Sequence, residues 1–363
     1  MKPLTGLLAG LLLPALTLAQ TAPVPAAVPQ STTSTAPADD LNFDEFGDAD
    51  DKKVRLFATQ KVLFLSPTKL ISVGYEAQTP FDITSVGAHS IPASSVPRPG
   101  GASTLTQQVN RFSGLRLGLN APVISRSNFI LNLGLTYWNT GVGMTTPEQS
   151  RLFGALDQGL RSTGINATVF KPLNLKHFLL IQANADLNGT YQNLSEIDSR
   201  GLTYSGTAIY GWKPSDNLMW GLGVTRTYRA GQVLHIPVVF YNQTFNPRWG
   251  VEAVFPAKAN LRRNFGTSGL LMLGYEIEGN AYFLGNTSTP QDLYLRRGEL
   301  KPRITYERKL AGFIWLSAQA GVRYNWRFDV FDTQNPTAGE TPRFSNTLGT
   351  APYVNISLNL VSP

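Results

Sequence analysis

The sequence predicts an all-β protein: a transmembrane, antiparallel, up-and-down β-barrel of about fourteen strands that follows a disordered N-terminal tail. Three observations lead to this prediction. The chain begins like an exported protein, its apolar residues alternate over long segments, and short and long connections separate those segments. Alternation with a period of two indicates strands, and a tilted strand that crosses a membrane needs about 9 to 11 residues.

Residues 1–19, MKPLTGLLAGLLLPALTLA, have the layout of a secretory signal peptide. Lys2 precedes an apolar run, and the segment ends on the small residue Ala19. Pro14 interrupts the run and no stop-transfer charges follow, which argues against a membrane anchor. The chain has no cysteine, so lipid acylation, disulfides and thiol chemistry are excluded. We expect export, with the bacterial outer membrane as destination.

Residues 20–52 are predicted to form a disordered periplasmic tail, rich in Pro, Ala and Thr and then acidic. The predicted barrel, residues 53–363, is strongly basic by contrast. A basic barrel favours anionic neighbours, although ordinary solubility explains the charge equally well. The expected partners are outer-membrane lipid, lipopolysaccharide phosphates, the barrel-assembly machinery and a small polar or charged solute. Nucleic acid is excluded by the compartment.

The second face of the alternating segments distinguishes a barrel from a soluble sandwich. In NLMWGLGVTRTY, residues 217–228, Leu218, Trp220, Leu222 and Val224 share one face. The opposite faces of such segments carry mostly Gly, Asn, Ser, Thr and Gln, which suits a polar lumen, whereas a sandwich has a charged outer face. Aromatic residues gather at the segment ends, as they do in membrane-interface girdles.

The connections determine the strand count. Outer-membrane barrels have short periplasmic turns and long outer loops. The short connections are 123–128, 172–176, 213–217, 242–248 and 307–312. The long ones are 79–110, 139–160, 189–200, 284–292 and 331–349. Fourteen strands require an extra hairpin in which one strand ends near Pro256, the next covers 258–265, and the turn 266–269 follows. A single bulged strand over 249–265 leads to the alternative of twelve.

The segment LYLRRGELKPRITYERKL, residues 293–310, is predicted to be a membrane strand despite its eight charges. Its opposite face is apolar except for Arg296 and Arg308, which can lie at the two interfaces. Turning the charged face to lipid would cost about 2–4 kcal/mol for each Arg or Lys near the midplane, so that face points inward. Pro302 cannot donate to a ladder and predicts a bulge.

Further charged residues fall on inward faces of neighbouring segments, so we expect a lumenal network of carboxylates and bases. Such a network either braces a narrow barrel or forms a constriction that selects a charged or polar solute. The predicted members are Glu252, Arg262, Glu276, Glu278, Arg297, Glu299, Lys301, Arg303, Glu307, Arg323 and Arg327.

The stretches VLHIPVVFYNQTFNPRWGVEAVFPAKANLRRNF, YEIEGNAYFL and LYLRRGELKPRITYERKLAGFIWLSAQAGVRYNWRFDVFD carry a family resemblance. Over roughly residues 55 to 361 the chain resembles bacterial outer-membrane barrels of the domain-of-unknown-function 6268 family. The resemblance implies a barrel fold and an outer-membrane location, and it brings no catalytic or substrate-binding residues.

The predicted function is that of a structural or passive, pore-like barrel without catalytic motif, cofactor or metal. One alternative is a barrel enzyme of the lipid hydrolase or deacylase type, because the alternation lets His235 point inward, where a Ser could join it. The three histidines are far apart in the sequence and suggest no metal site. A second alternative is a soluble periplasmic β-sandwich that binds glycans.

Overall fold

The computed structural model describes residues 56–87, 103–193, 196, 198–285 and 292–362. Every described strand belongs to one compact unit, Ala49–Pro363. The predicted signal peptide and acidic tail lie outside the described residues, so both stay predictions.

The strands are β1 Lys69–Gln78, β2 Phe81–Gly87, β3 Ser103–Arg126, β4 Phe129–Met144, β5 Leu160–Pro172, β6 His177–Gly189, β7 Leu202–Ser215, β8 Leu218–Thr227, β9 Leu234–Asn246, β10 Trp249–Phe255, β11 Lys258–Asn264, β12 Gly269–Phe283, β13 Tyr294–Ala311, β14 Ile314–Phe331, β15 Phe344–Leu348 and β16 Ala351–Val361. The described helical segments are η1 Pro147–Gln149, α1 Arg151–Asp157 and η3 Ser199–Gly201.

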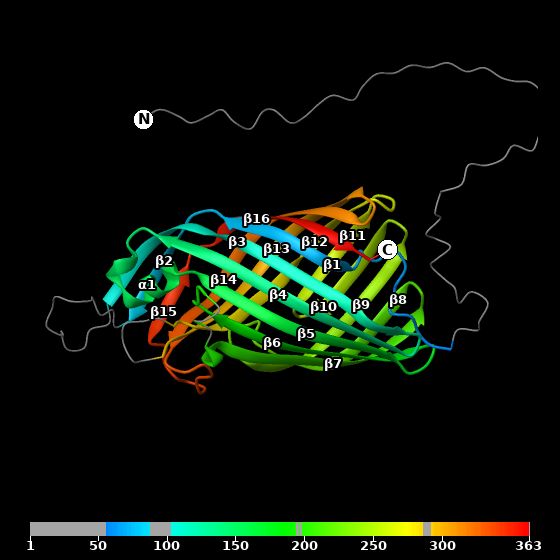
Figure 1. Ribbon diagram of the computed structural model, residues 1–363, viewed down its shortest axis with the longest axis horizontal. Helices are drawn as coiled ribbons and strands as arrows, with labels where there is room; N and C mark the ends of the chain where they lie inside the picture. Colours follow the sequence, from blue (N-terminus) through cyan, green and yellow to red (C-terminus); the bar gives the residue numbers. More distant parts are fainter. Residues whose placement is uncertain (1–55, 88–102, 194–195, 197, 286–291, 363) are drawn as a thin grey trace, which may run out of the picture. The chain divides into compact units, whose positions relative to one another are not determined.

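All sixteen strands belong to one sheet that closes on itself (Figure 1). β1 pairs with both β16 and β3, and β2 pairs with both β15 and β3. β1 and β2 are therefore one interrupted barrel strand, and β15 and β16 are another. The result is the predicted fourteen-strand antiparallel barrel. The twelve-strand alternative is wrong because β10 and β11 form the separate hairpin, and the sandwich alternative is wrong because the sheet closes.

The barrel wall is apolar outside and polar inside, as alternation dictates when a strand is lined by lipid on one face and by the lumen on the other. On β16, Ile356 is 58% exposed, whereas its neighbours Asn355 and Ser357 are buried. β1 shows the same pattern, with Val73 exposed and Glu76 buried. Apolar residues that face outward need an apolar surrounding, and polar residues that face inward need partners in the lumen.

The barrel has two unlike ends. The short turns between paired strands, apart from the turn between β10 and β11, lie at one end together with the first residue of β1 and the last of β16; this is here called the turn end (Figure 1). The opposite end, here called the loop end, carries the long connections.

Several predicted long loops are structured at the loop end. Residues 79–110 contain β2 and the start of β3, residues 139–160 contain α1, and residues 331–349 contain β15. The oxygen of Ser150 caps α1 by accepting a bond from the Leu152 amide at 3.2 Å. The prediction of loops failed for these segments because their apolar residues are buried inside the barrel. These segments therefore lack the regular lipid-facing apolar alternation by which membrane strands are recognised in a sequence.

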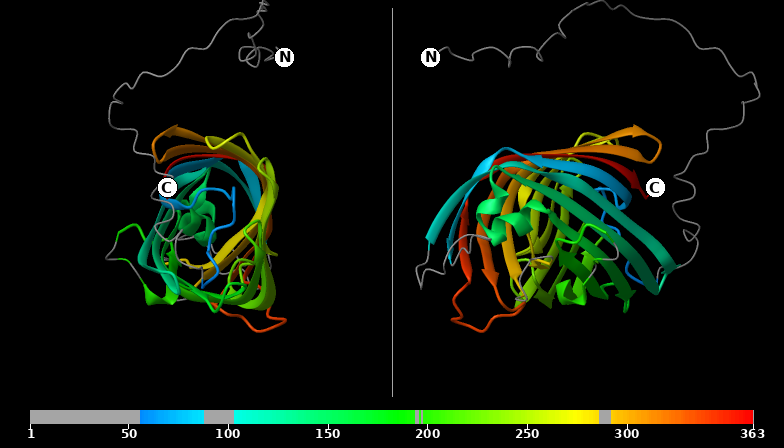
Figure 2. Two further views of the ribbon diagram at one scale, coloured as in Figure 1. Left: turned by 90° about the vertical axis from the view of Figure 1, so that its right-hand side faces the viewer. Right: turned by 60° about the vertical axis from the view of Figure 1, so that its left-hand side comes forward.

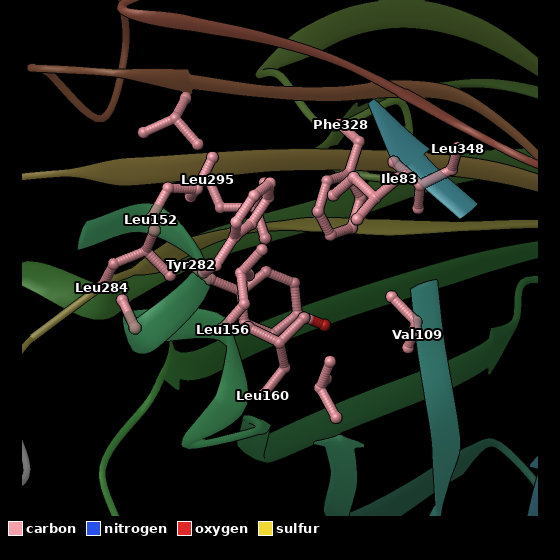
Figure 3. Close-up of a cluster of buried hydrophobic side chains, with 14 of the residues drawn as sticks. Ile83, Val109, Leu152, Leu156, Leu160, Tyr282, Leu284, Leu295, Phe328 and Leu348 are labelled. Atoms are coloured by element: carbon pink, nitrogen blue, oxygen red, sulfur yellow. The ribbon is translucent and has the colours of Figure 1, made fainter. Parts of the chain in front are cut away.

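α1 lies within the ring of strands and fills the loop end with apolar side chains (Figures 2 and 3). Phe153 and Leu152 of α1 are completely buried. The cluster is called the loop-end core. Its members are Phe81, Ile83, Val109, Phe112, Val142, Leu152, Phe153, Ala155, Leu156, Leu160, Tyr282, Leu284, Leu293, Leu295, Phe328, Val330, Phe344, Leu348 and Ala351.

The ring narrows at the loop end because the ends of β6 and β12 touch across it. Phe283 pairs with Gly189, and the Thr190 amide donates to the Phe283 carbonyl at 3.2 Å. Asn280 also donates to the side-chain oxygen of Asn188 at 3.0 Å. At this level nine barrel strands form a smaller ring, and β7 to β11 lie outside it.

A bulge in β14 reverses the predicted faces beyond it. Gly298 of β13 pairs with Arg327, but the next residue, Glu299, pairs with Asn325, so Trp326 is the extra residue. An extra residue shifts the side-chain alternation by one. Phe328 therefore points inward. The prediction of a bulge at Pro302 is wrong, because the register between β13 and β14 is the same on both sides of Pro302.

Within the described residues, no helix is long and apolar enough to cross a membrane.

The outward face of β16 provides a test of the membrane orientation. We expect Ile356→Arg to destabilise the folded barrel in lipid vesicles by about 2–4 kcal/mol, because a guanidinium at the bilayer midplane is poorly solvated. The exposed His235, near the start of β9, is the control, and His235→Arg should cost about 0–1 kcal/mol there. Urea unfolding followed by tryptophan fluorescence measures both. Equal losses would contradict the orientation.

Candidate functional site

A network of buried charges crosses the middle of the lumen. The carboxylate of Glu76 on β1 accepts from Arg116 of β3 at 2.7 Å and from Lys301 of β13 at 2.8 Å. It also accepts from Arg323 of β14. The carboxylate of Glu278 on β12 lies 3.2 Å from both Arg116 and Lys301. Because β3 and β12 are not neighbours in the sheet, the Arg116–Glu278 pair bridges the lumen.

A second group extends this network toward the loop end. Glu299 accepts from Arg297 at 2.7 Å, and the Nε atom of Arg323 lies 3.2 Å from the same carboxylate oxygen. The guanidinium of Arg323 stands 5.0 Å from the ring of Phe112 and 5.5 Å from the ring of Tyr353. Glu299 is 1% exposed, so these charges depend on one another for solvation. The central network is Glu76, Arg116, Glu278, Arg297, Glu299, Lys301 and Arg323.

Three further pairs line the inner wall. Arg262 lies 2.7 Å from Glu252, Arg303 lies 2.5 Å from Glu276, and Lys69 lies 2.7 Å from Glu307. The two residues of each pair are on different strands, so each pair holds two strands of the wall together.

The structure places ten of the eleven predicted network residues on the inner face. The exception is Arg327, and its inward prediction is wrong because the Trp326 bulge turns it outward, where it donates to the Ala230 carbonyl at 3.4 Å. Arg296 points outward as predicted, but it is buried beneath residues 228–233 and does not face a membrane interface.

Sequence reasoning missed Glu76, Arg116 and Lys69. The signal for Glu76 was present in ISVGYEAQ, where Val73 and Tyr75 alternate with Ser72, Gly74 and Glu76.

A partly open cavity of about 370 Å³, lined mainly by residues with charged or polar side chains, lies next to the central network. Both signs of charge line it, together with hydroxyls and amides. Arg116 stacks on Trp138 at 4.3 Å in its wall. The lining residues are Lys69, Ser72, Gly74, Glu76, Arg116, Leu117, Gly118, Thr136, Trp138, Glu276, Glu278, Lys301, Arg303, Gln319, Asn355 and Ser357.

Residues 56–66, here called the turn-end strap, bind to the turn end. The Lys213 ammonium donates to the carbonyls of Thr59 at 3.1 Å and Lys61 at 2.6 Å. Asn264 donates to the Phe64 carbonyl at 3.0 Å, and the Ser66 amide donates to Glu252 at 2.9 Å. These bonds link the strap to three barrel strands, β7, β10 and β11.

The strap also places an apolar residue inside the barrel. Val62 is buried against Phe170, Phe178 and Met219 from β5, β6 and β8. Phe64 adopts a φ of 57°, which is unfavourable for a residue with a Cβ and costs on the order of 1 kcal/mol. The strap is therefore anchored at several points but carries local strain.

The inward prediction for His235 is wrong. It is exposed and pairs with Arg226, on the outer face that Val224 and Val239 share. Val238, on the opposite face of β9 from His235, is buried inside. His177 hydrogen-bonds to the Tyr210 hydroxyl at 2.8 Å, and His89 lies outside the described residues. In the described part of the chain, no group of three His, Asp or Glu residues is arranged to hold a metal ion.

A family model described as Domain of unknown function (DUF6268) matches residues 153–361. Among solved structures, a Pseudomonas aeruginosa FadL homologue is 10% identical, with a TM-score of 0.36 over 80% of this chain and 90% of that one. The Pseudomonas putida toluene transporter TodX is 10% identical, with a TM-score of 0.32 over 84% and 94%. The Escherichia coli outer membrane protease OmpT is 10% identical, with a TM-score of 0.26 over 81% and 95%. These are likenesses of fold alone, and no curated protein matches the sequence.

The Arg262–Glu252 pair tests whether the lumenal charges depend on pairing. Arg262 is fully buried, so we expect Glu252→Gln to destabilise the barrel by about 3–5 kcal/mol by leaving that charge without its partner. The exposed pair Arg343–Asp332, at 3.2 Å, is the control, and Asp332→Asn should cost at most about 1 kcal/mol. Urea unfolding in vesicles compares the two. Similar small losses would mean that water solvates Arg262 in the lumen.

Proposed function

The chain belongs to the family described as Domain of unknown function (DUF6268), and we propose that it is a gated, non-catalytic outer-membrane barrel. In this proposal the protein holds a small polar cavity between two closures and passes a small polar or charged solute only when a closure moves. The turn end faces the periplasm, because short turns are periplasmic in outer-membrane barrels.

The apolar outer wall supports the membrane location. Side chains such as Leu273, Ile304 and Leu358 are more than half exposed on strands whose opposite faces carry polar or charged residues. A bilayer removes these side chains from water, at about 25 cal/mol per Å² of buried apolar surface.

The observation that carries the proposal is that both ends of the lumen are occupied while the middle is hollow and polar. The loop-end core closes one end with close-packed apolar side chains, and the turn-end strap spans the other. A permanently open pore has neither closure, and a purely structural barrel does not require a polar cavity of about 370 Å³.

The two closures differ in how readily they can move. The loop-end core buries nineteen of the described apolar residues, from α1 and from many strands, so opening it would expose them together. The strap is one chain segment, held mainly by hydrogen bonds to the barrel, and only Ala58, Val62 and Leu65 of the strap are packed against apolar neighbours or buried. The strap is therefore the gate in this proposal.

The barrel-enzyme alternative has lost the feature that motivated it, since His235 lies outside the lumen. The central network uses its carboxylates in ion pairs, which suits bracing and solute selection. We therefore propose no catalytic step.

Single-channel recording in planar bilayers tests the gate. We expect the unmodified protein to show rare, brief openings and Lys213→Met to open about tenfold more often, since each charged hydrogen bond is worth about 1.5–3 kcal/mol. Lys171→Met is the control, because Lys171 is an exposed lysine on β5 that makes no bond to the strap.

Two results would contradict the proposal. A large, steady current through the unmodified protein would show that the ends are open. No current through either the unmodified or the Lys213→Met protein would show that no passage exists.

A further inference from the structure

The barrel wall is incomplete beside β9 and β12, because the hairpin between them is short. β10 and β11 have seven residues each, whereas β9 has thirteen and β12 has fifteen. The last pair of β10 with β9 is Phe255–Val239, and that of β11 with β12 is Lys258–Glu276. Residues 234–238 and 277–282 therefore have a ladder partner on one side only among the described strands.

A single loop covers this break. Residues 228–233, between β8 and β9, are here called the flap. Arg296 of β13 donates to the Gly231 carbonyl at 2.8 Å, and Arg327 of β14 donates to the Ala230 carbonyl at 3.4 Å. The flap thus crosses from its own strands to the outer faces of β13 and β14.

Glycines let the flap lie directly on the strand backbone. A Cβ on Gly279 would come within 2.4 Å of the Arg229 carbonyl oxygen, and one on Gly298 within 2.9 Å of the Ala230 backbone. Gly231 itself has a φ of +71°, and a Cβ there would lie 2.7 Å from the Arg297 carbonyl oxygen. Any side chain at these positions would push the flap outward.

Arg229 of the flap reaches through the break. Its side chain is 47% exposed, yet its Nη1 atom donates to the Ile277 carbonyl at 2.9 Å, on the edge that β11 leaves unpaired. The same atom lies 3.6 Å from the carboxylate of Glu276, which lines the polar cavity. One side chain therefore contacts the outside, the strand edge and the cavity wall.

The groups that Arg229 faces are acidic. Besides Glu276, Asp186 of β6 faces this part of the lumen, two residues from Asn188, which accepts from Asn280 of β12 at 3.0 Å. Among the described residues, no hydrogen bond or salt bridge to the Asp186 carboxylate is present. Moving Arg229 away would leave two carboxylates at the opening, with Arg303 bound to Glu276 at 2.5 Å and hydroxyl or amide side chains such as Asn184 beside them.

We propose that the break between β9 and β12 is a side portal of the lumen, closed by the flap and selective for small organic cations of the ammonium or guanidinium class. Such a cation replaces the Arg229 guanidinium at Glu276, is attracted by the inward-facing Asp186, and enters the cavity, so the loop-end core stays closed. Tyr324 and Trp326 are exposed on the outer face of β14 at this level, which places the portal near the interfacial aromatic girdle. This inference rests on the proposed gated passage and names its second opening.

Cysteine accessibility tests the portal, because the natural chain has no cysteine. Asn184→Cys places a thiol inside, two residues from Asp186 on the same face of β6. The probes are a trimethylammonium-bearing methanethiosulfonate and its sulfonate-bearing counterpart, added from the loop-end side. We expect Arg229→Ala to speed modification by the cationic probe about tenfold or more, as loss of a charged hydrogen bond implies, and the anionic probe to react more slowly.

Two matched controls separate the portal from a general loosening. Arg263→Ala removes another exposed arginine, which stacks on Trp249 away from the flap, and should leave the rate unchanged. Gly298→Ala, whose Cβ would meet the Ala230 backbone at 2.9 Å, should speed modification by displacing the flap, whereas Gly206→Ala, where a Cβ meets its nearest atom at 3.5 Å, should not. Arg229→Lys should restore slow modification in part, because an ammonium keeps the charge.

Planar-bilayer currents in methylammonium chloride complete the test. Arg229→Ala should shift the reversal potential of the current toward the equilibrium potential of methylammonium. Equal modification rates with and without Arg229, or faster reaction of the anionic probe, overturns the portal. If Lys213→Met raises the current while Arg229→Ala changes nothing, the gated passage stands and the portal falls; if neither variant has an effect, both fall.

Discussion

Strand edges that meet lipid must be paired, and this constraint governs the whole wall. A backbone N–H or C=O without a partner costs several kcal/mol in hydrocarbon, so a membrane sheet has to close. The ring closes where β1 and β2 pair with β16 and β15 on one side and with β3 on the other. The short hairpin β10–β11 violates the constraint locally.

Beside that hairpin, groups other than a neighbouring strand form hydrogen bonds to the exposed strand edge. The Ala257 carbonyl accepts from the Ile277 amide at 2.8 Å, Arg229 donates to the Ile277 carbonyl, and the end of β6 meets Phe283. The narrowing to nine strands and the covering by the flap are therefore linked consequences of one short hairpin. A wall repaired by side chains and a loop can open at lower cost than one closed by a continuous ladder.

The interior follows a second constraint, since buried charges are tolerated only when they are paired. Replacing a buried ion pair by apolar residues is often neutral or stabilising, so the central network is weak evidence for stability. Its geometry has another consequence. Arg116 and Lys301 connect β3 and β13 to Glu76 and Glu278, which holds opposite walls at a fixed distance and keeps the cavity polar. An apolar core in the same place would have left no solvated space.

Different interactions hold the two closures in place: apolar packing at the loop end and polar contacts at the turn end. The loop-end core is close-packed and apolar, like the interior of a soluble protein inside a membrane barrel. The turn-end strap is held mainly by polar contacts, with Lys213 as its main anchor, and is strained at Phe64. This asymmetry is what assigns the gate to the turn end in the proposed function.

The sequence by itself determined the barrel, its strand number and, for most residues, whether the side chain points into the lumen or outward. Alternation, lipid energetics and turn chemistry are local, so Glu299, Lys301 and Arg303 could be directed inward from their own segment. The separate hairpin whose first strand ends near Pro256 also followed from the strand count. The tertiary structure decided what local patterns do not encode. The unpaired Trp326 turned Arg327 outward, His235 took the opposite face from the one inferred, and α1 entered the lumen. A bulge depends on the register between two strands, and an internal plug depends on which surface a segment meets after the ring has closed. Neither property can be read from one segment alone.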